Sequence, residues 1–342
     1  MYKGRSGLLH RSFLFLVLKI LRSFFGTTNT SSLTQFPMVC WGSLTVAKKF
    51  YYGGQAVIEG VMMRGQKAMV TAVRRPGGGL AIDVQTLANI YTGWVRRAPL
   101  IRGIIVLIEA LVLGIKTLLY SANVSLEEEE AEISGGLVWV MVAVALVFAI
   151  ALFFIAPLFL TKLLDPYLNS PLVFNLIDGF IRLIILIAYL KLISLVPDIK
   201  RIFAYHGAEH KAVNAYEDGA PLEVETARGY GTAHVRCGTS FLFVVLIIAI
   251  MVFALVGLPS LWLMVLSRVL LIPVIAALGY EVIYFGANHA KNKLVRAVVA
   301  PGLWLQRLTT REPDDSQLEI ALAALKKVTE IDQPEEAAQA SS

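Results

Sequence analysis

Four long apolar segments, all after residue 135, most constrain how this chain can fold. They are 136–160, 173–196, 241–262 and 263–285, and the first and third contain no charged residue. Each is long enough to cross about 30 Å of hydrocarbon as a helix. Only 16% of the residues are charged, whereas roughly a quarter are charged in soluble proteins. The sequence therefore predicts an α-helical multi-pass membrane protein with about four transmembrane helices, whose partner is the lipid bilayer.

Positive charge is distributed unevenly around these segments. Lys and Arg number 15 in residues 1–134, five in 197–239 and seven in 287–342. With four spans these regions fall on one side, which the positive-inside rule assigns to the cytoplasm. The predicted location is the inner membrane of a bacterium or cyanobacterium, or a plastid membrane if the amino terminus is a transit peptide. No basic, aromatic-interleaved face stands out, so nucleic acid is not a predicted partner.

Changes in composition divide the chain into seven predicted segments. The first has seven Lys or Arg and no acidic residue, which fits a transit peptide, a basic amphipathic anchor or a start codon assigned too far upstream. The segments are 1–49, a basic leader or targeting segment; 50–95, a small β-rich module; 96–134, an amphipathic helix and acidic linker; 135–196, transmembrane helices 1 and 2; 197–239, a loop with the histidines and a cysteine; 240–286, transmembrane helices 3 and 4; and 287–342, a cytoplasmic C-terminal helix and tail.

The β-rich module contains two short runs, 68–74 and 80–86, joined by a proline and three glycines. Such runs with a Gly-rich connection predict a β-hairpin. Further on, Arg102, Glu109 and Lys116 recur every seven residues in an apolar stretch. They share one helical face, which predicts an amphipathic helix on the membrane surface or against the bundle.

The C-terminal region ends in apolar residues at helical spacing. This pattern predicts a short soluble helix, with Asp315 or Ser316 as its cap. Residues 332–342 are polar and small, and we expect them to be disordered.

Two histidines on one segment are the strongest candidates for a site. His206 and His210 stand in the order H-x-x-E-H, with Glu209 directly before the second. On a helix, residues four apart lie on one face, so both imidazoles can bind one ion. The order is the inverse of the metalloprotease pattern H-E-x-x-H. His234 and Cys237 follow as H-x-x-C, in a chain with only five His and two Cys.

Zinc is the predicted metal, or another divalent transition metal, because zinc accepts imidazole, thiolate and carboxylate. Three arrangements remain open. In the first, the two histidines and one further ligand leave a position for water, and Glu209 acts as the general base. In the second, four protein ligands close a structural site, and in the third no metal binds. The candidates for the further ligand are His234, Cys237, Glu217 and Glu281, with His289 in reserve.

Charged residues inside the apolar segments are costly in a membrane and usually face a functional interior. Glu281 is therefore a candidate for an accessory role at the site, unless it pairs with Arg268 or with a basic residue of the second segment. Glu59, in the β-rich module, is another accessory candidate. Asp178 and Arg182 are one helical turn apart and are expected to pair with each other.

Four motifs resemble those of one family. The chain is similar to the YqhQ-like family, domain of unknown function 1385, over residues 50–330. The resemblance implies a bacterial or plastid-lineage multi-pass membrane protein with a metal, and it implies no substrate. The motifs are GGQAVIEGVMMRG at 53–65, YHGAEHK at 205–211, HVRCGTSF at 234–241 and PGLWLQ at 301–306.

The site and the spans together predict a zinc-dependent membrane hydrolase that acts at the cytoplasmic membrane face. The likeness to H-E-x-x-H favours a peptidase, by analogy alone, and the sequence identifies neither a substrate nor an oligomeric state. The alternative is a non-enzymatic membrane assembly or transport factor in which the metal is structural.

Overall fold

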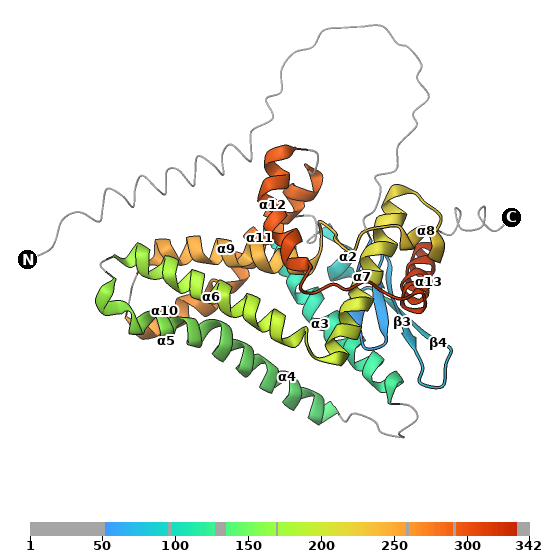
Figure 1. Cartoon of the computed structure of the whole chain (residues 1–342), viewed down its shortest axis with the longest axis horizontal. Helices are drawn as coiled ribbons and strands as arrows, with labels where there is room; N and C mark the ends of the chain where they lie inside the picture. Colours follow the sequence, from blue (N-terminus) through green and yellow to red (C-terminus); the bar gives the residue numbers. More distant parts are fainter. Residues whose placement is uncertain are drawn as a thin grey trace, which may run out of the picture. The chain divides into compact units, whose positions relative to one another are not determined.

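Helices make up most of this protein, and a small sheet comes first in the described chain (Figure 1). The computed structural model describes residues 52–94, 98–126, 135–168, 170–257, 260–289 and 292–333. The predicted leader and the acidic run at 127–130 lie outside these residues. The elements are β1 (Gly53–Val57), β2 (Gly60–Arg64), β3 (Ala68–Arg74), β4 (Leu80–Thr86), α2 (Asn89–Thr92), α3 (Ile101–Ser125), α4 (Gly135–Ile150), η3 (Ala151–Ile155), α5 (Ala156–Leu163), η4 (Asp165–Tyr167), α6 (Pro171–Ile193), α7 (Pro197–Asp218), α8 (Val224–Arg228), α9 (Gly238–Val256), α10 (Leu261–Leu270), α11 (Ile272–Asn288), α12 (Lys293–Gln306) and α13 (Asp315–Asp332).

The strands form one antiparallel sheet in the order β1-β2-β3-β4. The predicted hairpin is confirmed, because β3 and β4 pair along their whole length. A second hairpin, β1 and β2, precedes it. Its turn contains Glu59, whose φ of 52° is unusual for a residue other than glycine.

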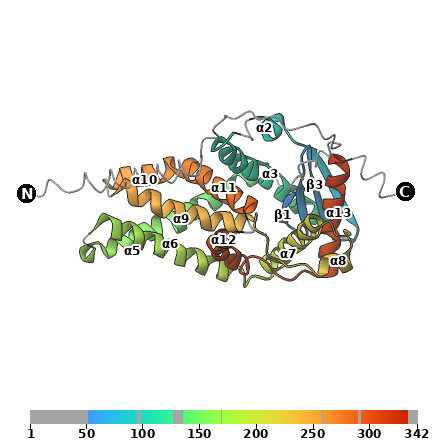
Figure 2. The same cartoon turned by 90° about the horizontal axis from the view of Figure 1, so that it is seen from above.

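Helices cover both faces of the sheet (Figure 2). On one face, Val61 of β2 packs with Tyr205 of α7 and Leu325 of α13. On the other face, Val73 of β3 packs with Val124 of α3. Strand side chains alternate between faces, so one short sheet supports both layers. The β-rich module, the histidine segment and the C-terminal helix thus share one core around this sheet.

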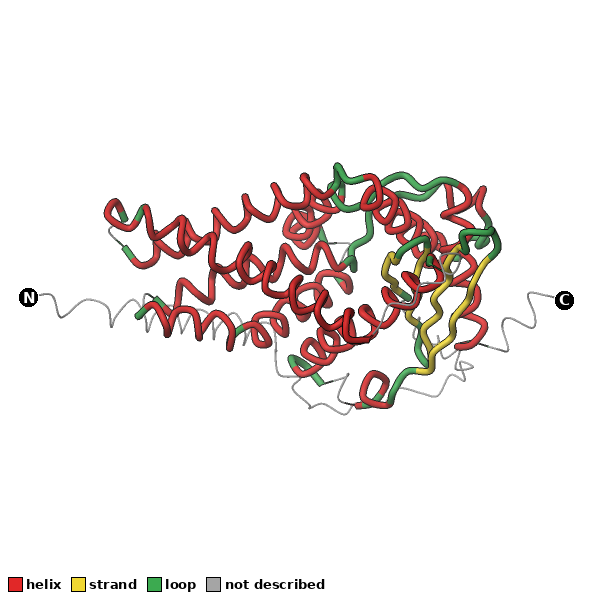
Figure 3. Tube along the Cα trace, turned by 90° about the horizontal axis from the view of Figure 1, so that it is seen from below, coloured by secondary structure: helices red, strands yellow, loops and turns green. Residues whose placement is uncertain are grey.

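Several of the described helices are long and apolar enough to cross a membrane. Three qualify alone, at Ile101–Ser125, Gly136–Leu163 and Gly238–Val256, and two bent pairs raise the number to five. The pair α10 and α11 bends by 43°, whereas α6 and α7 bend by 101°. Since α7 packs on the sheet, α6 is the apolar partner in that pair. Figure 3 shows the strands towards one end of the molecule and a group of helices at the other end, while α3 and α7 pack on the sheet.

The first of these helices, α3, was predicted to be amphipathic at the membrane surface or against the bundle. It packs against both the bundle and the sheet. Glu109 is buried and accepts a hydrogen bond of 2.8 Å from Arg64 Nε of β2. Arg102 pairs with Glu281 of α11, while Lys116 is exposed. The three charges on one face therefore have three different environments.

The C-terminal helix α13 is confirmed, but its predicted cap is wrong by one residue. Asp314 is the N-cap, because its side chain accepts a hydrogen bond of 2.8 Å from Gln317 N. Gln317 completes a capping box by accepting from Asp314 N at 3.0 Å. Disorder was predicted for 332–342, but the helix continues to Asp332, and residues 334–342 lie outside the described residues.

Asp332 fixes the end of α13 to the β2–β3 turn, and its replacement by alanine tests this contact. Its carboxylate accepts hydrogen bonds from Gln66 N at 2.6 Å and Lys67 N at 3.0 Å. Loss of these charge-assisted bonds should lower the free energy of unfolding by about 1–2 kcal/mol. Urea unfolding followed by tryptophan fluorescence measures the change. Glu330→Ala, on the exposed face of α13, is the matched control, and equal stability of the two variants would contradict the assignment.

Candidate metal centre

Helix α7 carries both histidines of the H-x-x-E-H motif. It begins with Pro197 in its first turn, where proline is favoured, and it ends at Gly219, whose φ is 73°. The segment described from the sequence as a loop is therefore helical over its first half. The rings of His206 and His210 lie on one face of the helix, with their centroids 4.4 Å apart.

Cys237, the N-cap residue of α9, joins the two histidines. One ligand atom from each of the three residues lies within 4.8 Å of the others. His206 Nε2 and Cys237 Sγ are 3.2 Å apart. Two such atoms on one tetrahedral zinc ion would lie about 3.6 Å apart, given Zn–N of about 2.1 Å and Zn–S of about 2.3 Å. Small movements would suffice for the three residues to hold one ion.

The sulfur of Cys237 also caps α9. It accepts a hydrogen bond from Thr239 N at 3.4 Å. Cys237 is a buried free thiol, and Cys40 lies outside the described residues.

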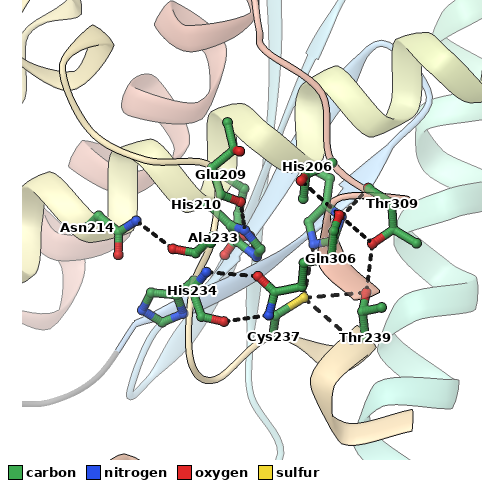
Figure 4. A network of polar contacts seen from close by, with 12 residues as sticks. His206, Glu209, His210, Asn214, Ala233, His234, Cys237, Thr239, Gln306 and Thr309 are labelled. Carbon is green, nitrogen blue, oxygen red and sulfur yellow. Dashed lines mark hydrogen bonds and ion pairs between the residues drawn. The ribbon is translucent and has the colours of Figure 1, made fainter. Parts of the chain in front are cut away.

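Each imidazole is oriented by a backbone carbonyl on its other side (Figure 4). His206 Nδ1 donates to the carbonyl oxygen of Thr309 at 2.8 Å. His210 Nδ1 donates to the carbonyl oxygen of Thr232 at 2.6 Å. Since a carbonyl can only accept, both rings carry their proton on Nδ1. Nε2 of each ring is then the atom available to an ion, and metal-binding histidines are usually oriented in this way.

Gly207 brings the Thr309 carbonyl within reach of His206. A Cβ atom at this position would lie 2.0 Å from the carbonyl oxygen of Arg311. Arg311 N in turn donates to the carbonyl oxygen of Phe203 at 2.9 Å. The chain after α12 therefore crosses α7 at backbone contact distance, which only glycine permits.

Gln306, at the end of α12, holds the loop that carries His234. The Gln306 side chain is fully buried. Its Oε1 accepts from His234 N at 2.9 Å, and its Nε2 donates to His234 O at 2.7 Å. Asn214 of α7 supports the same loop by donating to Gly231 O at 2.9 Å. Gln306 was part of a recognised motif, but no sequence signal gave it, Thr232 or Thr309 this role.

His234 lies next to the three residues without joining them. Its ring centroid is 5.7 Å from that of His210, and Figure 4 shows the ring pointing away from the Cys237 sulfur. Its Nε2 instead lies 3.5 Å from Glu217 Oε2, and Glu217 also pairs with Arg236. Burial lowers the pKa of the His234 imidazole, and the charge of Glu209 only partly opposes this shift.

Glu209 lies on the sheet side of the histidine pair. Its side chain is buried, and Oε2 is 3.5 Å from His210 Nε2. Its Cγ is close to β1, where a Cβ atom on Gly54 would approach it to 3.0 Å. Glu209 therefore stands beside the candidate ligands, as the motif predicted, and is not one of the three residues that meet.

The other accessory candidates, Glu59 and Glu281, each form an ion pair with an arginine. Glu59 pairs with Arg201 and accepts from the Tyr205 hydroxyl at 3.2 Å. Glu281 was expected near the site or paired with Arg268, but it binds Arg102 and accepts from the backbone N–H of Leu100 at 2.9 Å.

Two further predictions concern His289, the reserve ligand, and the ion pair of Asp178 and Arg182. His289 is exposed and stacks on Phe285. Asp178 pairs with Arg182 at 2.9 Å, as predicted, and also with Arg268 at 3.2 Å.

The structure is that of a mostly helical protein with several apolar helices, a small sheet and a cluster of two histidines and a cysteine. The chain belongs to the family described as "Protein of unknown function (DUF1385)", whose model matches residues 98–331. It is 37% identical over 297 residues to "Uncharacterized protein YqhQ" of Bacillus subtilis strain 168, a match that covers 82% of this chain and 93% of that protein. The resemblance noted from the motifs is confirmed. No solved structure matches the chain.

Gly207→Ala tests the backbone contact that positions the Thr309 carbonyl. The added methyl group would overlap the carbonyl oxygen of Arg311, and such overpacking costs about 1–3 kcal/mol. Thermal unfolding should therefore show a lower melting temperature. Gly238→Ala is the matched control, because a Cβ atom there meets nothing within 4 Å. The contact would be refuted by a Gly207→Ala protein as stable as the control.

Proposed function

We propose that this protein is a membrane-embedded, zinc-dependent hydrolase with its site at the inner face of the bilayer. The observation that carries the proposal is the meeting of His206, His210 and Cys237, with both imidazoles oriented by backbone carbonyls. Two nitrogens and one sulfur suit zinc well. They also suit other divalent transition metals, so metal availability would decide the ion bound in the cell.

The surroundings of His210 support a bound cation. The Nδ1 proton of His210 is used by the Thr232 carbonyl, so its Nε2 faces the Glu209 carboxylate at 3.5 Å. Two electron-rich groups facing each other in a buried site are unfavourable unless a positive charge lies between or beside them. A metal ion on Nε2 would supply that charge, and so would a proton on the same atom.

The number of ligands favours catalysis over a structural role. Catalytic zinc sites use three protein ligands and leave one position for water, whereas structural sites are closed by four. His234, the fourth candidate, is held by Gln306 and faces Glu217. A site of three ligands therefore fits a hydrolase better than a structural centre.

Glu209 is the general base of the proposed reaction. A metal ion at this site would lower the pKa of bound water towards neutrality. Glu209 takes one proton from the water, and the hydroxide oxygen forms a bond to the carbonyl carbon of the substrate. Glu209 then gives the proton to the leaving nitrogen or oxygen as the acyl bond breaks. The products are an acid and an amine or alcohol, so one water is consumed for each bond broken.

The apolar helices support insertion in a membrane, with the site at its boundary. Cys237 directly precedes α9, which is long and apolar enough to span. Trp139 and Trp262 are 73% and 65% exposed and stand near the starts of α4 and α10, as is typical of residues at membrane interfaces. We propose the inner membrane of a bacterium, or a plastid membrane, because with four spans, α3 not among them, the histidine segment lies on the basic side.

Zinc content tests the ligand set. The purified wild-type protein should contain about one zinc per chain, and His206→Asn should lose most of it because two ligands hold zinc poorly. His289→Asn, which removes an exposed histidine, should retain the metal. Elemental analysis by plasma mass spectrometry gives the ratios. Equal zinc in both variants would exclude the proposed centre.

Glu209→Gln tests the general base separately. Glutamine keeps the shape of the side chain but cannot take a proton, so turnover should fall about 10²–10⁴-fold with the zinc content unchanged. Glu225→Gln, at an exposed position of α8, should leave turnover as it is. If Glu209→Gln turns over as fast as the wild-type protein, Glu209 is not the general base and the proposed mechanism fails.

A further inference from the structure

The sheet has a free edge beside the candidate metal centre. Among the strands of the described residues, β1 pairs only with β2, so no described strand lies along its other edge. The backbone groups on that edge follow from the register. Arg74 N donates a hydrogen bond to Glu59 O. Glu59 and every second residue after it, Val61 and Met63 of β2, therefore form their backbone hydrogen bonds with β3. Gly60 and Met62 of β2 instead form backbone hydrogen bonds with β1, in the pairs Val57–Gly60 and Gln55–Met62.

Gly54 and Ala56 are left with their N–H and C=O groups directed away from the sheet. Gly54 is exposed and Ala56 is half-buried. Among the described residues, neither backbone forms a hydrogen bond outside the strand pairing. Unpaired strand edges of this kind attract another extended chain, and proteins normally cover or blunt them.

This edge lies next to Glu209. Gly54 is close enough that a Cβ atom on it would be 3.0 Å from Glu209 Cγ, and Glu209 Oε2 is 3.5 Å from His210 Nε2. A single side chain thus connects the exposed backbone of β1 with the histidine pair. An added strand lies about 4.8 Å from its neighbour, so it would run alongside the proposed general base.

The opposite edge of the sheet provides a comparison. β4 is also an edge strand, and Ile82 and Val84 have backbone groups directed outwards by the same register argument. Their side chains are 44% and 45% exposed. The candidate ligands lie on α7 and at the start of α9, whereas the main neighbour of β4 in the described chain is β3, so this edge serves as an internal control.

We propose that the substrate is a polypeptide in extended conformation, which adds to the free edge of β1 as a further strand. This inference rests on the proposed hydrolase function and deepens it. A peptide backbone alternates donors and acceptors at the spacing that Gly54 and Ala56 present, and strand addition is a common mode of peptide recognition. A lipid acyl chain has no such groups. In the reaction the carbonyl–nitrogen bond breaks, the water oxygen joins the acyl carbon, and both water protons end on the two products.

The test compares one proline substitution on each edge. Ala56→Pro removes an outward N–H from β1, and Ile82→Pro removes one from β4; proline is tolerated at such positions because the sheet's own pairing is kept. Both zinc-loaded, full-length variants are assayed on casein, which is unstructured, and on p-nitrophenyl acetate, which cannot pair with a strand. Ala56→Pro should lower the ratio of casein to ester hydrolysis about tenfold, the effect of one lost hydrogen bond. Ile82→Pro should leave the ratio unchanged.

A second measurement does not depend on the folding of a variant. Casein-derived peptides that the wild-type protein cleaves are resynthesised with N-methyl groups on every second amide, in both frames. Methylation in one frame should abolish cleavage, because those amides face β1, and the other frame should be tolerated. Equal effects of both frames, or equal effects of the two prolines, would overturn the inference.

The remaining outcomes separate the two proposals. Ester hydrolysis without casein hydrolysis would overturn the peptide substrate and leave the hydrolase. Hydrolysis of neither compound by the zinc-loaded protein would remove the hydrolase and the inference together. If Ala56→Pro changes the oligomeric state and not the casein ratio, the β1 edge pairs with a second copy of the chain, which also overturns the inference.

Discussion

The hydrogen bonds from the two histidine Nδ1 atoms to the carbonyl oxygens of Thr309 and Thr232 are the constraint on which the site depends. They fix the tautomer of each ring and turn both Nε2 atoms towards the same space. Without them the rings could rotate about their side-chain bonds, and the three candidate ligands would meet only part of the time. Positioning by rigid neighbours is what gives a metal site its geometry.

These carbonyls come from chain segments on either side of α9, so the apolar helices and the sheet unit jointly build the site. Thr232 lies in the loop before α9, and Thr309 follows α12. Helix α3 joins the two regions by two ion pairs in its first half, Glu109 with Arg64 of the sheet and Arg102 with Glu281 of α11. Removing one member of either pair would take away the opposite charge from a group that is largely shielded from water, which is costly. These two ion pairs therefore help to hold the sheet and the apolar helices in one arrangement.

Local patterns in the sequence predicted the local parts of the structure. The β3–β4 hairpin, the long apolar helices and the common face of His206 and His210 all follow from spacing within a few residues. A role for α3 as more than a surface helix was harder to predict, because its charged residues are neutralised by partners far away in sequence.

The parts of the site that the sequence did not predict depend on distant contacts. Glu281 pairs with Arg102, 179 residues away, rather than with a basic residue nearby. His234 is turned aside because Gln306, 72 residues later, holds its backbone. The spacing H-x-x-C could not show that Cys237 lies beside the two histidines and that His234 does not. Their positions depend on contacts with residues far away in the sequence.

X-ray absorption at the zinc edge of the purified protein would test the central claim most directly. The account predicts a first shell of two imidazole nitrogens, one sulfur and one lighter oxygen, with Zn–S of about 2.3 Å. A shell without sulfur, a shell with a third imidazole in place of the oxygen, or a protein that takes up no zinc would contradict it.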